Sequence, residues 1–73
     1  MNEYVVNFLW DNQAHVWIAT SDDVPGLVLE HGSFDALLER VRMAVPELLA
    51  LNAPGTGDIF IHYNTQRQER LAV

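Results

Sequence analysis

The sequence predicts an α+β domain of order β-β-β-α-β, in which one kinked helix covers one face of an antiparallel-dominated four-stranded sheet. Three observations predict it. Short runs of aromatic and β-branched residues, separated by turn signals, fill the first thirty positions. A helical apolar period follows, and after it comes another β-rich run. With 73 residues the chain has room for one domain, residues 1–73, with no separate DNA-binding domain.

The first three strands follow from residue type and from the turns between them. Residues 3–10 (EYVVNFLW) and 15–20 (HVWIAT) are expected to form an antiparallel hairpin, because the Asp-Asn-Gln at 11–13 is a turn signal. The segment 21–26 (SDDVPG) interrupts the pattern, and its Pro-Gly pair indicates a second turn. Residues 27–31 (LVLEH) then form a third, short strand.

The helix is predicted from its cap and its apolar period. Ser33 is expected to be the N-cap, and Asp35 lies where the helix dipole favours negative charge. A kink or a restart is expected at Pro46, which lacks an amide hydrogen. The apolar stripe comprises Phe34, Leu37, Leu38, Val41, Val45, Leu48 and Leu49.

The last strand and the two sheet faces bear on function. After the loop NAPGTG, residues 58–64 (DIFIHYN) are expected to form the fourth strand, and the polar run QRQER either continues it or frays. One helix covers only one sheet face, yet neither set of alternating residues in the first two strands is clearly polar. A second cover over the helix-free face is therefore expected. The alternative is that the aromatic residues lie over the edges of a single core.

Charge narrows the choice of partner. Ten acidic residues face four arginines and no lysine, for a formal charge of −6. Phosphate backbones would repel such a chain, so direct nucleic-acid binding is not expected, whereas a basic protein partner is favoured. The alternative is that the charge only keeps the protein soluble. Without a signal peptide pattern or about 20 consecutive apolar residues, the chain is expected to be cytoplasmic and not membrane-bound.

The residue pattern favours no catalytic, cofactor or metal site. There is no cysteine, and no two of His15, His31 and His62 are within five residues of each other, although His31 and His62 could meet across neighbouring strands. Asp22 and Asp23 point to opposite sides of an extended chain, so they are interpreted as loop residues and not as a metal doublet. The catalytic alternative is a minimal metal-dependent hydrolase using these two aspartates, Asp11 or His62.

The run V-W-x-A-x-S-D-D-V-P-G-L at 16–27, followed by L-L-E-R-V and V-P-E-L-L, resembles a small bacterial domain family of unknown function related to HicB-type antitoxins. The resemblance implies a truncated ribonuclease-H-like fold of the same β-β-β-α-β order. It also implies inhibition of a small basic toxin of the HicA type, a ribonuclease, by a protein that is not itself a nuclease. Many HicB-type antitoxins continue into an operator-binding segment, and no such segment is expected here after the fourth strand.

The sequence is therefore interpreted as a non-enzymatic protein-binding module, antitoxin-like and homodimeric. The alternative is a homodimeric structural or adaptor protein without a toxin. Trp10 and Trp17 are the expected anchors at one end of the sheet, with Trp17 beside an acidic rim of Asp22, Asp23 and Glu30. Trp17→Ala is then expected to weaken partner binding by more than ~2 kcal/mol. Changing both loop aspartates to Asn should slow association and leave the fold intact. The rival for Trp17 is a core position beneath the helix.

Overall fold

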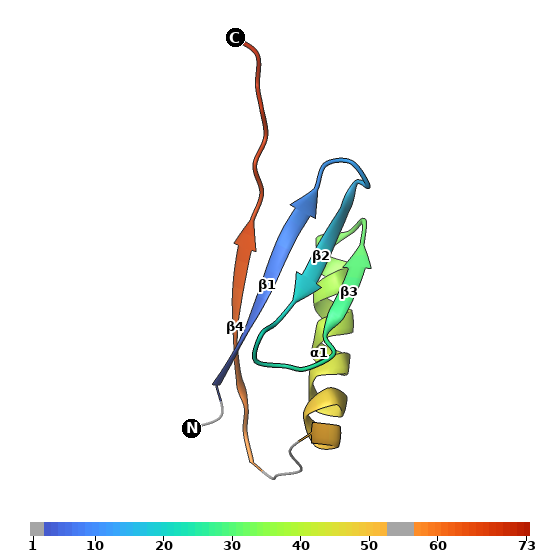
Figure 1. The fold of residues 1–73 in the computed structure, drawn as a ribbon, viewed down its shortest axis with the longest axis vertical. Helices are drawn as coiled ribbons and strands as arrows, with labels where there is room; N and C mark the ends of the chain where they lie inside the picture. The colour runs from blue at the N-terminus through green and yellow to red at the C-terminus, as the bar shows by residue number, and fades with distance from the viewer. Residues whose placement is uncertain (1–2, 53–56) are drawn as a thin grey trace.

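The elements follow the predicted order. The computed structural model describes residues 3–52 and 57–73, so positions 53–56 of the predicted NAPGTG loop lie outside it. Strands β1 (Glu3–Asp11), β2 (Val16–Thr20) and β3 (Val28–His31) precede helix α1 (Phe34–Asn52), and β4 (Phe60–Gln66) follows it. The sheet order is β3-β2-β1-β4, and α1 lies behind the sheet against β2 and β3 (Figure 1). The α+β fold with one helix on one face is confirmed.

The sheet is mixed, with two antiparallel pairings and one parallel pairing. Strand β2 pairs antiparallel with both β1 and β3, whereas β4 pairs parallel with β1. The helix carries the chain from one edge of the sheet to the other, so β3 and β4 are the two edge strands. His31 in β3 and His62 in β4 therefore lie on opposite edges. The idea that they meet across neighbouring strands is wrong.

The core lies between α1 and one face of the sheet. The apolar stripe of the helix faces the sheet as predicted, and two residues of the loop after β2 close the core from the side. The buried residues are Val6, Phe8, Ala19, Val24, Leu27, Leu37, Val41 and Val45. Burying each of the larger side chains contributes about 1.5–3 kcal/mol. This small cluster is the main source of stability for the fold.

The helix begins as predicted and runs through its proline. Ser33 Oγ accepts a hydrogen bond from the amide of Ala36 at 3.3 Å, and Asp35 lies in the first turn. Pro46 lies inside one continuous helix, so the helix does not restart there. Because Pro46 is on the exposed side, its ring does not displace the buried Val45 next to it.

The turn between β1 and β2 is held by a side chain, whereas the end of the chain has no regular structure. Asp11 Oδ1 accepts hydrogen bonds from the amides of Gln13 at 2.9 Å and Ala14 at 3.1 Å, which confirms the turn. Strand β4 ends at Gln66, and residues 67–73 run on without regular structure past the end of the sheet (Figure 1). Within the described ranges, no helix is both long and apolar enough to cross a membrane.

Candidate functional site

The sheet surface opposite α1, here called the open face, is not covered by the helix, which contacts β2 and β3 from the other side. Figure 1 views the molecule onto this face, with the helix behind. Because Val6, Phe8 and Ala19 point into the core, the alternate residues of each strand point away from the helix. These residues are Glu3, Val5, Asn7, Leu9 and Asp11 in β1, Val16, Ile18 and Thr20 in β2, Val28 and Glu30 in β3, and Phe60, His62, Asn64 and Gln66 in β4.

Apolar side chains are spread across the open face. Leu9 in β1 stands opposite Ile18 in β2, and Val28 in β3 stands opposite Thr20. Leu9 is 49% exposed, Val28 72% and Phe60 58%. An antiparallel sheet that faces water on one side normally carries polar residues there. The mixture agrees with the sequence pattern, in which neither face was clearly polar.

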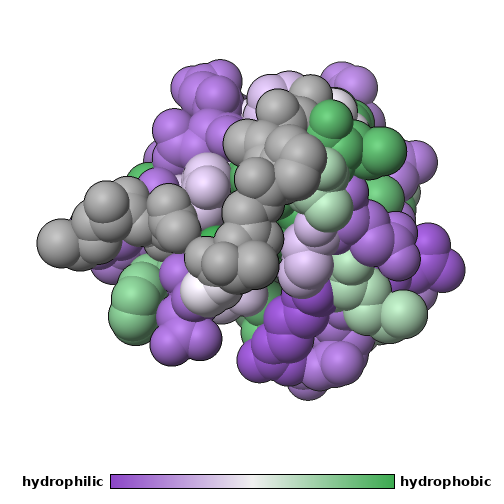
Figure 2. All heavy atoms as spheres, turned by 90° about the horizontal axis from the view of Figure 1, so that it is seen from below, coloured by the Kyte–Doolittle hydropathy of each residue, from purple (hydrophilic) through white to green (hydrophobic). Residues whose placement is uncertain are grey.

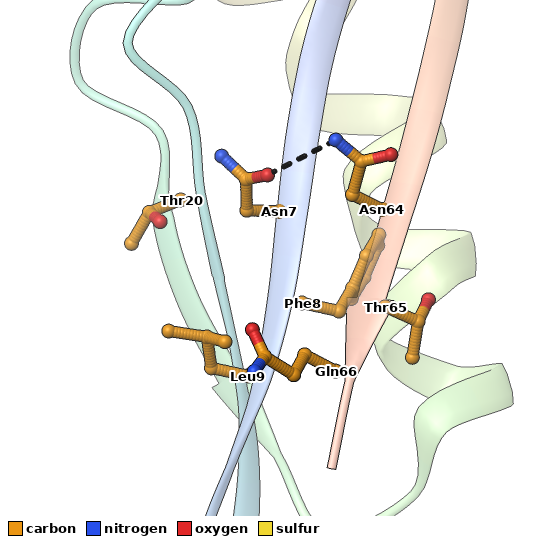
Figure 3. A pocket seen from close by; sticks show the side chains of 7 residues that line it. All are labelled: Asn7, Phe8, Leu9, Thr20, Asn64, Thr65 and Gln66. Carbon is orange, nitrogen blue, oxygen red and sulfur yellow. Dashed lines mark hydrogen bonds between the residues drawn. The ribbon is translucent and has the colours of Figure 1, made fainter.

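A shallow hollow of about 480 Å³ lies on the open face where β1 and β4 run side by side (Figure 3). Asn64 Nδ2 donates a hydrogen bond of 3.5 Å to Asn7 Oδ1 at its edge. The hollow is lined by Asn7, Phe8, Leu9, Thr20, Asn64, Thr65 and Gln66. These side chains are amides, hydroxyls and hydrocarbons, and none of them titrates near neutral pH. The hollow can therefore accept polar contacts but holds no acid, base or nucleophile of ordinary catalytic strength.

The open face is acidic. Its strands carry Glu3, Asp11 and Glu30, and by sequence position none of the four arginines lies within the strands. His62 Nε2 lies 2.9 Å from Glu3 Oε1, and both side chains are about half exposed. A contact between two side chains this exposed contributes at most ~1 kcal/mol. The apolar residues are therefore bordered by carboxylates without a compensating lysine or arginine on the strands.

The two tryptophans lie on the helix side of the sheet. The rings of Trp10 and Trp17 are 5.4 Å apart, which confirms that they share one end of the sheet. Trp17 also contacts the ring of Phe34 at 5.1 Å and packs against the core, beneath the first residue of α1. This placement agrees with the alternative given above for Trp17, a core position beneath the helix, and not with an interface anchor. The acidic loop follows the other end of β2, so the expectation that Trp17 lies beside it is wrong.

The two loop aspartates have different surroundings. The β1–β2 ladder stops at the pair Asn7 and Thr20, which leaves the backbone of Val5 without a partner strand on that side. Asp23 Oδ2 accepts a hydrogen bond from the Val5 amide at 2.7 Å, and Ser21 Oγ donates to the Val5 carbonyl at 2.5 Å. The Asp23 and Ser21 side chains thus make the two backbone hydrogen bonds with Val5 that a neighbouring strand would otherwise make.

Ser21 Oγ also accepts from the amides of Asp23 at 3.0 Å and Val24 at 3.1 Å, which turns the chain and directs the buried Val24 into the core. Asp22 is exposed and makes no hydrogen bond or ion pair within the part of the chain that the structure describes. Asp23 therefore builds the loop, whereas Asp22 is available to a partner.

The structure does not gather the five predicted binding residues into one patch. Glu30 is exposed on the open face opposite Ile18, Asp22 lies on the loop, and both tryptophans are on the helix side. The open-face residues Leu9 and Val28 were not among the predicted residues. Their alternation was visible in the sequence, but which set of alternates faces the helix depends on the packing of α1.

The acidic and histidine side chains that the structure describes are dispersed over the molecule. Among residues 3–52 and 57–73, no group of three or more His, Asp or Glu side chains is placed to hold a metal ion. The residues of the hydrolase alternative are also dispersed. Asp11 lies in the hairpin turn, Asp22 and Asp23 follow the opposite end of β2, and His62 lies on β4 beside Glu3.

Comparison with known proteins places the chain among domains of unknown function. Residues 3–73 match the family described as domain of unknown function DUF1902. The crystal structure of TTHA1013, a hypothetical protein from the extremely thermophilic bacterium Thermus thermophilus, is similar, with a TM-score of 0.73 and 35% sequence identity. The match covers 99% of this chain and 100% of the Thermus chain. No curated protein matches the sequence.

Proposed function

The chain belongs to the DUF1902 family of domains of unknown function, and we propose that it is a non-enzymatic protein-binding module that neutralises a small basic ribonuclease, as HicB-type antitoxins do. The observation that carries the proposal is the open face, where exposed apolar side chains are bordered by carboxylates without lysine or arginine. The link to antitoxins rests on the resemblance of the run at 16–27, V-W-x-A-x-S-D-D-V-P-G-L.

The chemistry of the open face fits a basic protein. Apolar residues such as Leu9 and Val28 supply area that gains free energy when a partner removes it from water. Glu30 on the same face and Asp22 on the neighbouring loop supply negative charge at the rim, where it raises the association rate and makes it salt-dependent. Catalysis has less support, because the hollow lacks titratable groups and the acids of the hydrolase alternative are dispersed.

The proposal is tested by expressing the neighbouring open reading frame with and without this protein. Growth arrest by the neighbour, relieved by co-expression, is expected. Leu9→Lys should abolish relief, because it places a positive charge on the open face. Met43→Lys is the matched control, since Met43 is 70% exposed on the helix. Arrest that co-expression does not relieve, or equal relief by both folded variants, contradicts the proposal.

A homodimeric structural or adaptor protein without a toxin is the second proposal. It is supported by the exposed area of the chain, 5539 Å², which is large for 73 residues. In that case the neighbouring gene product neither arrests growth nor binds the purified protein. Light scattering would still give a dimer mass.

A further inference from the structure

Strand β4 has an unprotected edge. It pairs with β1 on one side and has no neighbour on the other side among the described residues. Edge strands are normally made short, bulged or interrupted by lysine or proline, which prevents pairing with other chains. The sequence of β4, FIHYNTQ, is seven residues long and has no Lys, Arg, Pro or Gly. The other edge, β3, has only four residues and follows the Pro25-Gly26 turn.

Residues 67–73, here called the C-terminal arm, extend β4 in nearly the same direction (Figure 1). The root of the arm is held on its own chain. The Arg67 guanidinium lies 4.2 Å from the ring centre of Trp10, and Asn12 Nδ2 donates a hydrogen bond of 3.3 Å to the Gln68 carbonyl. Beyond this point the arm is exposed, and Leu71 is 77% exposed. Fixing the root lowers the entropy that a partner must remove to order the arm.

The chain exposes more surface than a compact monomer of its mass. About 4600 Å² is typical for a compact monomer of 8.3 kDa, against 5539 Å² here. The excess of roughly 900 Å² is close to the ~800 Å² that each partner contributes to a standard interface. The radius of gyration, 13.9 Å, likewise exceeds the ~11 Å expected for this length. At the helix end, apolar atoms reach the surface as separate patches among polar ones (Figure 2).

We propose that a second copy of this chain pairs antiparallel with residues 60–73, so that the arm of each copy lies along β4 of the other. The two four-stranded sheets then form one continuous sheet with both helices on the same side. The unpaired backbone N–H and C=O groups of β4 in one copy then form hydrogen bonds with those of the arm in the other copy. This inference goes beyond the proposed function, because it needs no toxin and leaves the open face free.

Charge and side-chain direction select the register. In a dimer with both helices on the same side, the two-fold axis is perpendicular to the sheet. Directly opposite residues then point to the same face, so the axis passes between the two copies of one residue near the middle of 60–73. An axis at Arg67 would place two guanidiniums side by side, which is unfavourable. An axis at Gln66 places Leu71 opposite Ile61 of the second copy. Ile61 packs against the core on the helix side, so this register gives the exposed Leu71 an apolar neighbour.

Light scattering over a range of concentrations tests the pairing. The full chain is expected to have twice the 8.3 kDa mass of one copy. Leu71→Asp should weaken dimerisation at least about tenfold, because it removes the apolar contact with Ile61. Leu51→Asp is the control, since Leu51 is 81% exposed at the helix end. A monomer at all concentrations, or equal effects of the two variants, would overturn the proposal.

Single cysteines test the register, because the chain has none of its own. In Gln66→Cys the two Cα atoms would be ~4.5–5.5 Å apart across the axis, within the span of a disulfide. In Asn64→Cys, on the same face, the two copies would lie four residues apart, about 13 Å. Mild oxidation should therefore crosslink Gln66→Cys and not Asn64→Cys. Crosslinking of both, of neither, or of Asn64→Cys alone contradicts the register. Leu9→Lys should leave the dimer mass unchanged, which separates this test from that of toxin binding.

Discussion

Replacing Asp23 by alanine is predicted to destabilise the fold, whereas the same change at Asp22 is not. Asp23 Oδ2 accepts the Val5 amide at 2.7 Å and so replaces a hydrogen bond that a strand would otherwise provide. Hydrogen bonds to charged groups contribute about 1.5–3 kcal/mol, and because this one is exposed, water replaces part of it. We therefore expect Asp23→Ala to lower the free energy of unfolding by ~1–2 kcal/mol.

The assay is thermal unfolding followed by circular dichroism, at one protein concentration because dimerisation would shift the midpoint. A loss of ~1–2 kcal/mol corresponds to a decrease in Tm of roughly 5–15 °C for a domain of this size. Asp22→Ala is the control, because Asp22 is exposed and unpaired within the described residues and its removal changes the net charge equally. It should change stability by less than about 0.5 kcal/mol.

Equal losses in the two variants would refute the structural role of Asp23. The sequence-based expectation that changing both aspartates to Asn leaves the fold intact is revised accordingly. Asp23→Asn keeps an oxygen acceptor but loses the charge, so its loss of stability should be intermediate between those of the two alanine variants.

Two further predictions concern the tryptophan and a glycine. Trp17→Ala should lower the free energy of unfolding by about 2–4 kcal/mol, because the ring packs against Phe34 and the core; an unchanged urea midpoint would show that this packing is unimportant. Gly26→Ala should cost roughly 1–2 kcal/mol because Gly26 has a φ of 87°, although a Cβ there would only reach ordinary contact with Leu48 at 3.5 Å. Gly32→Ala, without a positive φ, should lower Tm less.

Local signals predicted the fold well. The Ser33 cap, the apolar stripe of α1 and the Asp11 turn each depend on residues close in sequence, and all three are confirmed. The difference between Asp22 and Asp23 could not be predicted, because it depends on the Val5 backbone, which is eighteen residues from Asp23.

The orientation of the sheet faces required tertiary information for the same reason. The alternation of side chains along β1 puts Leu9 and Phe8 on opposite faces of the sheet. Which of the two is buried depends on the face that α1 covers. The helix lies over β2 and β3, so Trp17 in β2 falls beneath it, whereas the sequence placed that ring at an interface. The wrong placement of Trp17 thus has one cause, because no local sequence pattern shows over which strands α1 packs.

The parallel pairing of β4 with β1 has a consequence for the time course of folding. The hairpin of β1 and β2 closes over a few residues, but the β1–β4 ladder joins Glu3 to Phe60 across almost the whole chain. Contacts between residues so distant in sequence carry the largest loop-closure cost, so they are expected to form late. During synthesis, β1 can pair with β2 while β4 is still being made. Until β4 arrives, the nascent chain has an open strand in the centre of its future sheet, where capture by another chain would block completion of the fold.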